Sequence, residues 1–174
     1  MKRAQALSKS FFLVLLAATS IRAIAFDSLK LEDFKTTNMC KYCDLTEAPL
    51  SGRDMKGADF QNANLSGAIL SKANLSERVM EKRTLNTSFE SANLRKADLS
   101  EANLQNADFG NAYLRETKLD GADLTRANFS NANLKNASLR GANLTDAKLD
   151  GAKIEDAIFC KTTMPDRSMN DSGC

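Results

Sequence analysis

The most reactive side chains of this sequence are four cysteines, and two of them form the motif Cys40-Lys41-Tyr42-Cys43. A dithiol oxidoreductase uses such a pair when the first thiol lies at a helix N-terminus, which lowers its pKa. Here the residues after Cys43 begin a five-residue repeat and not a helical pattern. We therefore expect a structural disulfide between Cys40 and Cys43. Free thiols, and redox or metal chemistry, are the alternatives.

The other two cysteines, Cys160 and Cys174, end the last repeat and the chain, so a second disulfide that ties the tail back is a weaker expectation. Zinc sites usually need four Cys or His ligands, and the sequence has no histidine. It therefore also lacks the side chain most often used for acid–base work near neutral pH. No phosphate-binding loop or nucleophile elbow is present. We expect no catalytic residue, no metal and no cofactor.

From Cys43 onward the sequence repeats every fifth residue, as in Ala63-Asn64-Leu65-Ser66-Gly67. This period fits neither an α-helix nor a simple strand, so the chain must turn once in every unit. We expect the central Leu or Phe and the small residue two positions earlier to point inward, with Asn or Asp between them facing water. Stacked units would then bury one continuous apolar column.

The pattern A-[DN]-L-x-x over residues 43–160 resembles the pentapeptide-repeat family. The resemblance implies an all-β fold, a right-handed quadrilateral β-helix with four units per coil. Phenylalanine recurs in every fourth unit at Phe89, Phe109 and Phe129, which independently hints at four units per coil. Leu149 and Phe159 do not continue this series. About 22 units give about five and a half coils and a rod of about 25 Å.

The period slips once, because the spacing between the central residues Leu75 and Phe89 is not a multiple of five. If Phe60 and Phe89 lie on the same face, the coil between them contains nine extra residues, and a loop bulges from one corner. This is the interpretation we favour. In the alternative, Met80 and Leu85 fill inward sites and the coil is merely distorted.

The interrupting segment, residues 76–88, is our first candidate for recognition, because repeat proteins often bind partners through insertions that leave a regular wall. An idle, solvated loop is the alternative. The candidate residues are Glu77, Arg78, Glu81, Lys82 and Arg83.

The second candidate for recognition is a basic stripe on one face. With four units per coil, this face collects charges in successive coils, and Glu116 is the main opposing charge. A solvated wall is the alternative to contact with an anionic partner. The basic residues are Arg95, Lys96, Arg115 and Lys135.

The N-terminal segment 1–25 has the three parts of a secretory signal. Basic residues precede an apolar run at 11–18, and the small-x-small triplet Ala23-Ile24-Ala25 follows, so we expect cleavage after Ala25. An uncleaved membrane anchor is the alternative, but the apolar run is shorter than the roughly 20 residues that span a bilayer. We expect an exported protein with no membrane span after cleavage, and export permits disulfides.

The flanks of the repeats lack the pattern. Asp27 or Ser28 could cap a short helix that places Leu31 and Phe34 over the open end of the first coil. The last residues are polar and are typical of a tail. The expected organisation is a signal peptide at 1–25, an N-terminal cap at 26–42, repeats at 43–75, a loop at 76–88, repeats at 89–160 and a C-terminal tail at 161–174.

Charge gives no reason to expect a nucleic-acid partner. The chain has 24 Lys plus Arg against 22 Asp plus Glu. Four of the basic residues and none of the acidic residues lie in segment 1–25. The remainder is therefore close to neutral and slightly acidic.

The sequence resembles exported cyanobacterial members of this family, so the resemblance implies export to the periplasm or the thylakoid lumen. Most members of the family have no assigned activity. We hypothesise a non-catalytic scaffold that binds a protein in that compartment. The alternatives are a thiol redox protein and a DNA mimic that binds topoisomerase. Export and the lack of a strong acidic excess argue against the DNA mimic.

Overall fold

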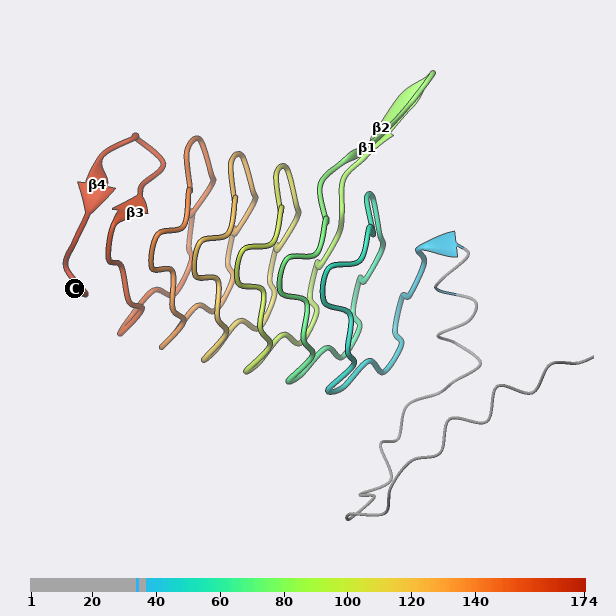
Figure 1. Cartoon of the computed structure of the whole chain (residues 1–174), viewed down its shortest axis with the longest axis horizontal. Helices are drawn as coiled ribbons and strands as arrows, with labels where there is room; N and C mark the ends of the chain where they lie inside the picture. The colour runs from blue at the N-terminus through green and yellow to red at the C-terminus, as the bar shows by residue number, and fades with distance from the viewer. Residues whose placement is uncertain (1–33, 35–36) are drawn as a thin grey trace, which may run out of the picture.

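The structure is a computed structural model that describes residue 34 and residues 37–174, which form a four-sided coil carrying two small hairpins (Figure 1). Single-residue parallel bridges join each coil to the next, so that Asn93 pairs with Tyr113 and Tyr113 pairs with Asn133. Each such step is four five-residue units along the chain. The named strands belong to the hairpins: β1 (Arg78–Met80), β2 (Arg83–Leu85), β3 (Thr162–Thr163) and β4 (Met169–Asn170).

A tight turn at each corner explains how one repeat unit forms one side of the coil. In a representative turn the Ala63 N–H donates to the Phe60 carbonyl at 2.9 Å, and Asn62 has a φ of 57°. A type II turn needs this positive φ at its third residue, which favours Gly and Asn. The central N–H groups bond to the adjacent coil, as from Phe60 to the Ser88 carbonyl at 2.8 Å. Local turns and long-range ladders thus alternate along the chain.

The core is a stack of side chains that follows the repeat. Four phenylalanine rings form one column, with centroid distances of 5.0 Å for Phe60–Phe89, 4.8 Å for Phe89–Phe109 and 4.7 Å for Phe109–Phe129. The small residue of each unit is also buried in most of the coil, and it is usually alanine. Four units per coil and both kinds of inward residue therefore agree with the repeat analysis.

Threonine replaces alanine at three inward positions and remains paired. Thr117 donates its hydroxyl to the Leu94 carbonyl at 2.7 Å, and Thr162 donates to the Leu139 carbonyl at 2.7 Å. Thr87 donates to the Ser76 carbonyl at 3.3 Å. Such pairing matters because an unpaired buried hydroxyl is costly.

The coil begins earlier than the repeat predicted. Met39 already pairs with Asp59, and Cys40 takes the first level of the phenylalanine column, so residues 39–42 are part of the coil and not of a separate cap. The ring of Phe34 lies 5.1 Å from that of Phe60 and covers this end of the column. The remainder of the expected helical cap, and the signal peptide at 1–25, lie outside the described residues.

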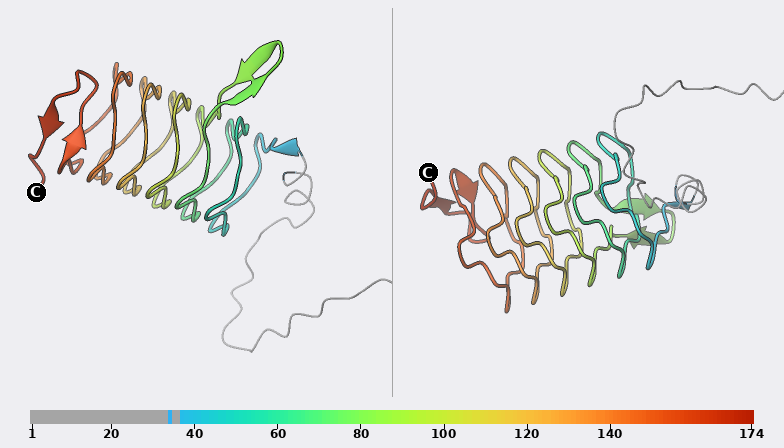
Figure 2. Two further views of the ribbon diagram at one scale, coloured as in Figure 1. Left: turned by 45° about the horizontal axis from the view of Figure 1, so that its top comes forward. Right: turned by 90° about the horizontal axis from the view of Figure 1, so that it is seen from below.

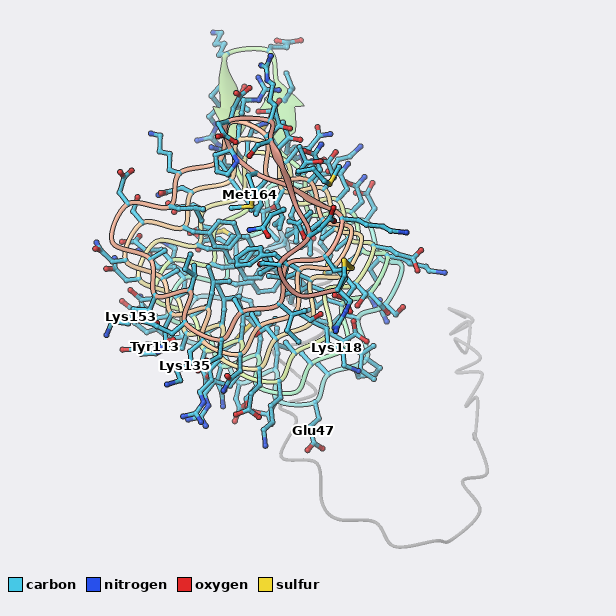
Figure 3. The ribbon with its side chains drawn as sticks, turned by 90° about the vertical axis from the view of Figure 1, so that its left-hand side faces the viewer. Glu47, Tyr113, Lys118, Lys135, Lys153 and Met164 are labelled. Carbon is cyan, nitrogen blue, oxygen red and sulfur yellow. A yellow bond between two sulfur atoms is a disulfide. The ribbon has the colours of Figure 1, made fainter. Side chains whose placement is uncertain are left out.

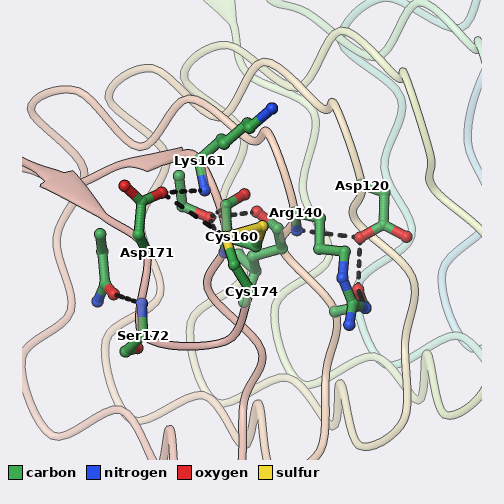
Figure 4. Close-up of a disulfide and its surroundings, with 11 residues drawn as sticks. Asp120, Arg140, Cys160, Lys161, Asp171, Ser172 and Cys174 are labelled. Atoms are coloured by element: carbon green, nitrogen blue, oxygen red, sulfur yellow. Dashed lines mark hydrogen bonds between the residues drawn. A yellow bond between two sulfur atoms is a disulfide. The ribbon is translucent and has the colours of Figure 1, made fainter.

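The C-terminal segment folds back as a hairpin, where the sequence suggested a polar tail. β3 pairs with β4, Thr163 continues the ladder by pairing with Asn143, and Met164 packs against the core. A disulfide joins Cys160 to Cys174 over this end (Figure 4). The hairpin covers only part of the last coil.

One expectation about the core fails at this end. The repeat places Ile154 at a central, inward position, but its side chain is 39% exposed. The reason is its place in the last coil, where no further coil lies against it. Among the described residues, no helix is both long and apolar enough to cross a membrane.

Candidate functional site

The segment 76–88 forms an antiparallel hairpin, β1–β2, that projects from a corner of the coil and leans toward its N-terminal end (Figures 1 and 2). Asp59 pairs with Ser88, whereas the regular spacing of the other coils would pair it with Val79. The nine extra residues therefore leave the coil without disturbing the Phe60–Phe89 stack. Met80 and Leu85 are half-buried on the hairpin and do not fill inward sites.

A glycine allows the base of the hairpin to pack closely on the coil. A Cβ atom added to Gly57 would lie 2.8 Å from the Cβ of Arg78 and 3.0 Å from the Leu85 carbonyl oxygen. The Thr87 hydroxyl also bonds the Ser76 carbonyl, which holds the two ends of the excursion together. The hairpin therefore leaves the coil from a fixed base.

The five candidate charges of this segment lie at different places on the hairpin, and only the two arginines line a cleft. Arg78 and Arg83 are exposed on the strands and line a cleft of about 540 Å³ between the hairpin and the first coil. Glu81 and Lys82 form the exposed turn, and Glu77 is half-buried at the base. The structure thus separates the two arginines from the other three candidates.

The basic stripe has the stacked geometry that the repeat predicted, but acidic residues partly neutralise it. We call Arg95, Arg115 and Lys135 the basic column, because they occupy equivalent positions in successive coils. Glu116 lies 3.2 Å from Arg115 and 3.8 Å from Lys96, and Asp156 lies 3.8 Å from Lys135. These ion pairs are exposed, so each contributes little to stability.

Sequence reasoning missed Tyr113, which is 55% exposed beside the basic column. It takes the Asn or Asp position of its unit, between Asn93 and Asn133. Figure 3 shows Tyr113, Lys135 and Lys153 projecting outward on one side of the coil. An aromatic residue in place of the usual Asn or Asp was the signal in the sequence that could have identified it.

The Cys-x-x-Cys motif forms a disulfide inside the first coil. Cys40 and Cys43 are each 4% exposed, and all four cysteines of the chain are in disulfides. Thiol–disulfide exchange requires access of an attacking thiolate to a sulfur atom. Because both of its cysteines are buried, the Cys40–Cys43 disulfide is typical of a structural bridge. The described residues contain no group of three or more His, Cys, Asp or Glu side chains arranged to hold a metal ion.

The Asn and Asp side chains between the inward residues have a structural role that the sequence analysis did not identify. Asp123 accepts the Thr125 backbone N–H at 3.1 Å, and Asp44 accepts that of Thr46 at 3.0 Å. These side chains therefore cap the corner turns. Hydrogen bonds from the side chain and backbone of Thr46 lower the pKa of Asp44.

The pKa of Asp123 results from opposing effects. Burial alone would raise it, but hydrogen bonds from Gln105 and Thr125 outweigh burial and lower the pKa below 3.8. In the C-terminal hairpin, hydrogen bonds from Ser168 lower the pKa of Asp166. The turns that these carboxylates cap thus favour their ionised form, which is a structural role.

Comparison with known proteins agrees with the repeat. A family model described as pentapeptide repeats, in eight copies, matches residues 43–77, 92–131 and 127–164. No curated protein matches the chain.

Several solved structures are similar. HetL from the cyanobacterium Nostoc sp. strain PCC 7120 is 32% identical with a TM-score of 0.55, and the match covers 76% of this chain and 66% of HetL. Rfr23 from Cyanothece 51142 is 29% identical with a TM-score of 0.41, covering 73% and 90%. A protein of the Arabidopsis thaliana thylakoid lumen is 30% identical with a TM-score of 0.39, covering 64% of each chain. The match thus spans about two thirds of the HetL and Arabidopsis chains.

Proposed function

Since the chain belongs to the pentapeptide-repeat family, whose members fold as right-handed quadrilateral β-helices, we propose that it is a non-catalytic scaffold that binds another protein through the β1–β2 hairpin. The scaffold is exported and acts in the periplasm or the thylakoid lumen. No cofactor and no nucleic acid takes part.

The observation that carries this proposal is the hairpin on an otherwise regular wall. Its strands leave the coil from a base fixed by Gly57, and Val79 on β1 is 72% exposed. A rigid framework that presents a projecting element is a common arrangement for recognition. HetL, which is described as involved in the regulation of heterocyst differentiation, has the same coil, and a regulatory role of that kind is compatible with binding alone.

Export is supported by the composition of residues 1–25 and by the disulfides. Two bridges, Cys40–Cys43 and Cys160–Cys174, use every cysteine of the chain. Disulfides persist in oxidising compartments and are rare in a reducing cytosol. A mature N-terminus at residue 26, read by mass spectrometry of the native protein, is the expected result. An N-terminus at Met1 would contradict export by this signal.

The basic column and Tyr113 offer a second surface on the same rod. Tyrosine and arginine are enriched among residues that dominate binding energies at protein interfaces. The ion pairs to Glu116 reduce the net charge of this wall, so we assign it an accessory role in orienting the partner.

The structure gives little support to the two alternatives. A DNA mimic needs an excess of acid, whereas this wall stacks Arg95, Arg115 and Lys135 in successive coils. A thiol redox protein needs an accessible sulfur, whereas Cys40 and Cys43 are buried. Reduction of insulin by the purified protein is the result that would revive the redox alternative.

The test is affinity capture from the native exported compartment with the intact chain and with a variant lacking residues 77–85. We expect the hairpin-less variant to lose a partner that the intact chain retains. A matched control replaces Arg95, Arg115 and Lys135 by glutamine and leaves the hairpin intact. Retention of the partner without the hairpin, together with its loss from this control, would transfer recognition to the wall.

A further inference from the structure

The cleft beside the hairpin combines paired basic groups with apolar surface. It has a volume of about 540 Å³ and lies between the β1–β2 hairpin and the N-terminal end of the coil. The hairpin side of the cleft is formed by Arg78, Met80, Arg83 and Leu85, and the opposite side includes Met39 and Asp59.

Strand register brings the two arginines onto the same face. Arg78 lies opposite Leu85, and Met80 lies opposite Arg83. Alternate residues of a strand share a face, so these four side chains project together, with the arginines at diagonal corners and the apolar residues at the other two. Diagonal neighbours in such a pair are roughly 7–8 Å apart.

The ion pairs between described residues include neither Arg78 nor Arg83, and both arginines are exposed. The acid on the opposite side, Asp59, is already engaged by Lys41 at 3.2 Å. Asp54 and Lys56 border a smaller hollow of about 270 Å³ that also touches Arg78, and their charges offset each other. The charged residues that line the cleft are Arg78, Arg83 and Asp59, so the lining carries a net positive charge. The strand register fixes the spacing of the two arginine backbones.

We propose that this cleft binds an extended acidic segment of the partner protein, with carboxylates at alternate positions of the segment. The proposal rests on the function proposed above and specifies the chemistry of the partner. Same-face side chains of an extended strand lie about 6.6–6.8 Å apart, which suits the diagonal spacing of the arginines.

Each guanidinium can form two parallel hydrogen bonds to one carboxylate, a geometry that lysine cannot reproduce. Met39, Met80 and Leu85 offer adaptable apolar contacts to the side chains between and beside the acids. A peptide is favoured over a simple anion because the arginines lie on a surface that also has apolar side chains.

Fluorescence anisotropy with the full chain and a labelled peptide, Leu-Glu-Ser-Glu-Leu with blocked ends, tests this inference. We expect it to bind at least about tenfold more tightly than the peptide with both glutamates replaced by glutamine, because hydrogen bonds to charged groups are strong. Arg83→Gln should weaken binding about tenfold, and Arg83→Lys should restore it only in part.

The matched control is Lys82→Gln, which removes one positive charge from the turn of the same hairpin but does not line the cleft. It should leave peptide affinity unchanged. Absence of binding, or equal weakening by Lys82→Gln and Arg83→Gln, would overturn the proposal. So would a polyphosphate chain that displaces the peptide and loses no affinity in Arg83→Gln.

The two proposals can fail separately. If deletion of residues 77–85 abolishes capture of the native partner but the acidic peptide does not bind, the hairpin is the recognition element and the inferred partner chemistry is wrong. If the peptide binds the cleft but capture survives the deletion, the chemistry of the cleft stands and the functional role of the hairpin falls.

Discussion

At the scale of single residues, the coil depends on a backbone conformation that most side chains avoid. Arg126 is one of several residues in the third position of a corner turn with a positive φ, here 59°. Non-glycine residues adopt this conformation at a cost of about 1–2 kcal/mol. Many corners therefore contain local strain, which the ladders and the core offset.

Arg126→Gly should consequently raise the free energy of unfolding by about 1 kcal/mol, because glycine adopts positive φ without that cost. Urea titration followed by circular dichroism measures the change. The matched control is Arg95→Gly, which also replaces an arginine by glycine. Arg95 is the second residue of its corner turn and does not have a positive φ. This control should destabilise by about 0.5–1 kcal/mol. Similar effects of both variants would show that the strain does not exist.

The lowered pKa of Asp123 predicts how the free energy of unfolding changes as the pH falls. Its pKa is lowered in the folded chain, so its contribution is present above the unfolded value near 3.8 and is lost as the pH falls through the lower folded value. Asp123→Asn should therefore reduce the loss of stability between about pH 5 and about pH 2, measured by urea midpoints. The control, Asn143→Ala, removes the equivalent turn cap one coil later without removing a titratable group, so it should leave the acid response unchanged. An unchanged acid response in Asp123→Asn would contradict this account.

At the scale of elements, the position of the hairpin depends on one glycine. Gly57→Ala should lower the free energy of unfolding by about 1–3 kcal/mol beyond the cost of the backbone alone, because the new methyl group meets Arg78 and Leu85. Gly52→Ala isolates the backbone cost, since Gly52 has a φ of 66° and nothing within 4 Å of an added Cβ. Urea titration gives the difference, and amide exchange in β1 and β2 should rise only in Gly57→Ala. Equal effects would mean that the hairpin does not rest on this corner.

The sequence predicted the repeating parts of these elements better than the exceptions. The period identified the inward residues of most units and the nine-residue excursion, because identical units must stack in register. It did not show that the excursion pairs as β1 and β2. At the two ends of the coil, Cys40 and Met164 take inward positions of the core stack, although the units around them do not match the five-residue pattern. Their inclusion depends on long-range ladder bonds, which a five-residue pattern does not contain.

The candidate site was predicted in part for a similar physical reason. Arg78 and Arg83 were identified as charges on an excursion, but their common face follows from the hairpin register. The cleft also needs Met39, which is distant in sequence and is brought close by the coil. Tyr113 was not predicted because the candidates on this wall are all charged residues, and an aromatic side chain at the polar position of its unit adds no charge to them.

At the scale of the whole molecule, each coil is supported only by its neighbours. Phe109→Ala in the middle of the phenylalanine column should cost about 3–5 kcal/mol, since the cavity lies between two stacked rings. Phe109→Leu should cost less than Phe109→Ala, because leucine leaves a smaller cavity between the two rings. The end control, Leu149→Ala, should cost less than Phe109→Ala because Leu149 is only half-buried in the last coil. Denaturant unfolding measures all three, and an end variant as harmful as the central one would contradict nearest-neighbour stacking.

The corner between Ser76 and Thr87 has an evolutionary consequence. The two residues are held together by a hydrogen bond, and the ladder resumes at Ser88 as though nothing had intervened. Insertions and deletions at this corner can therefore change length and sequence without shifting the register of any coil. The same corner is a natural place to graft a foreign loop, and a lineage could replace its partner there while inheriting an unchanged rod.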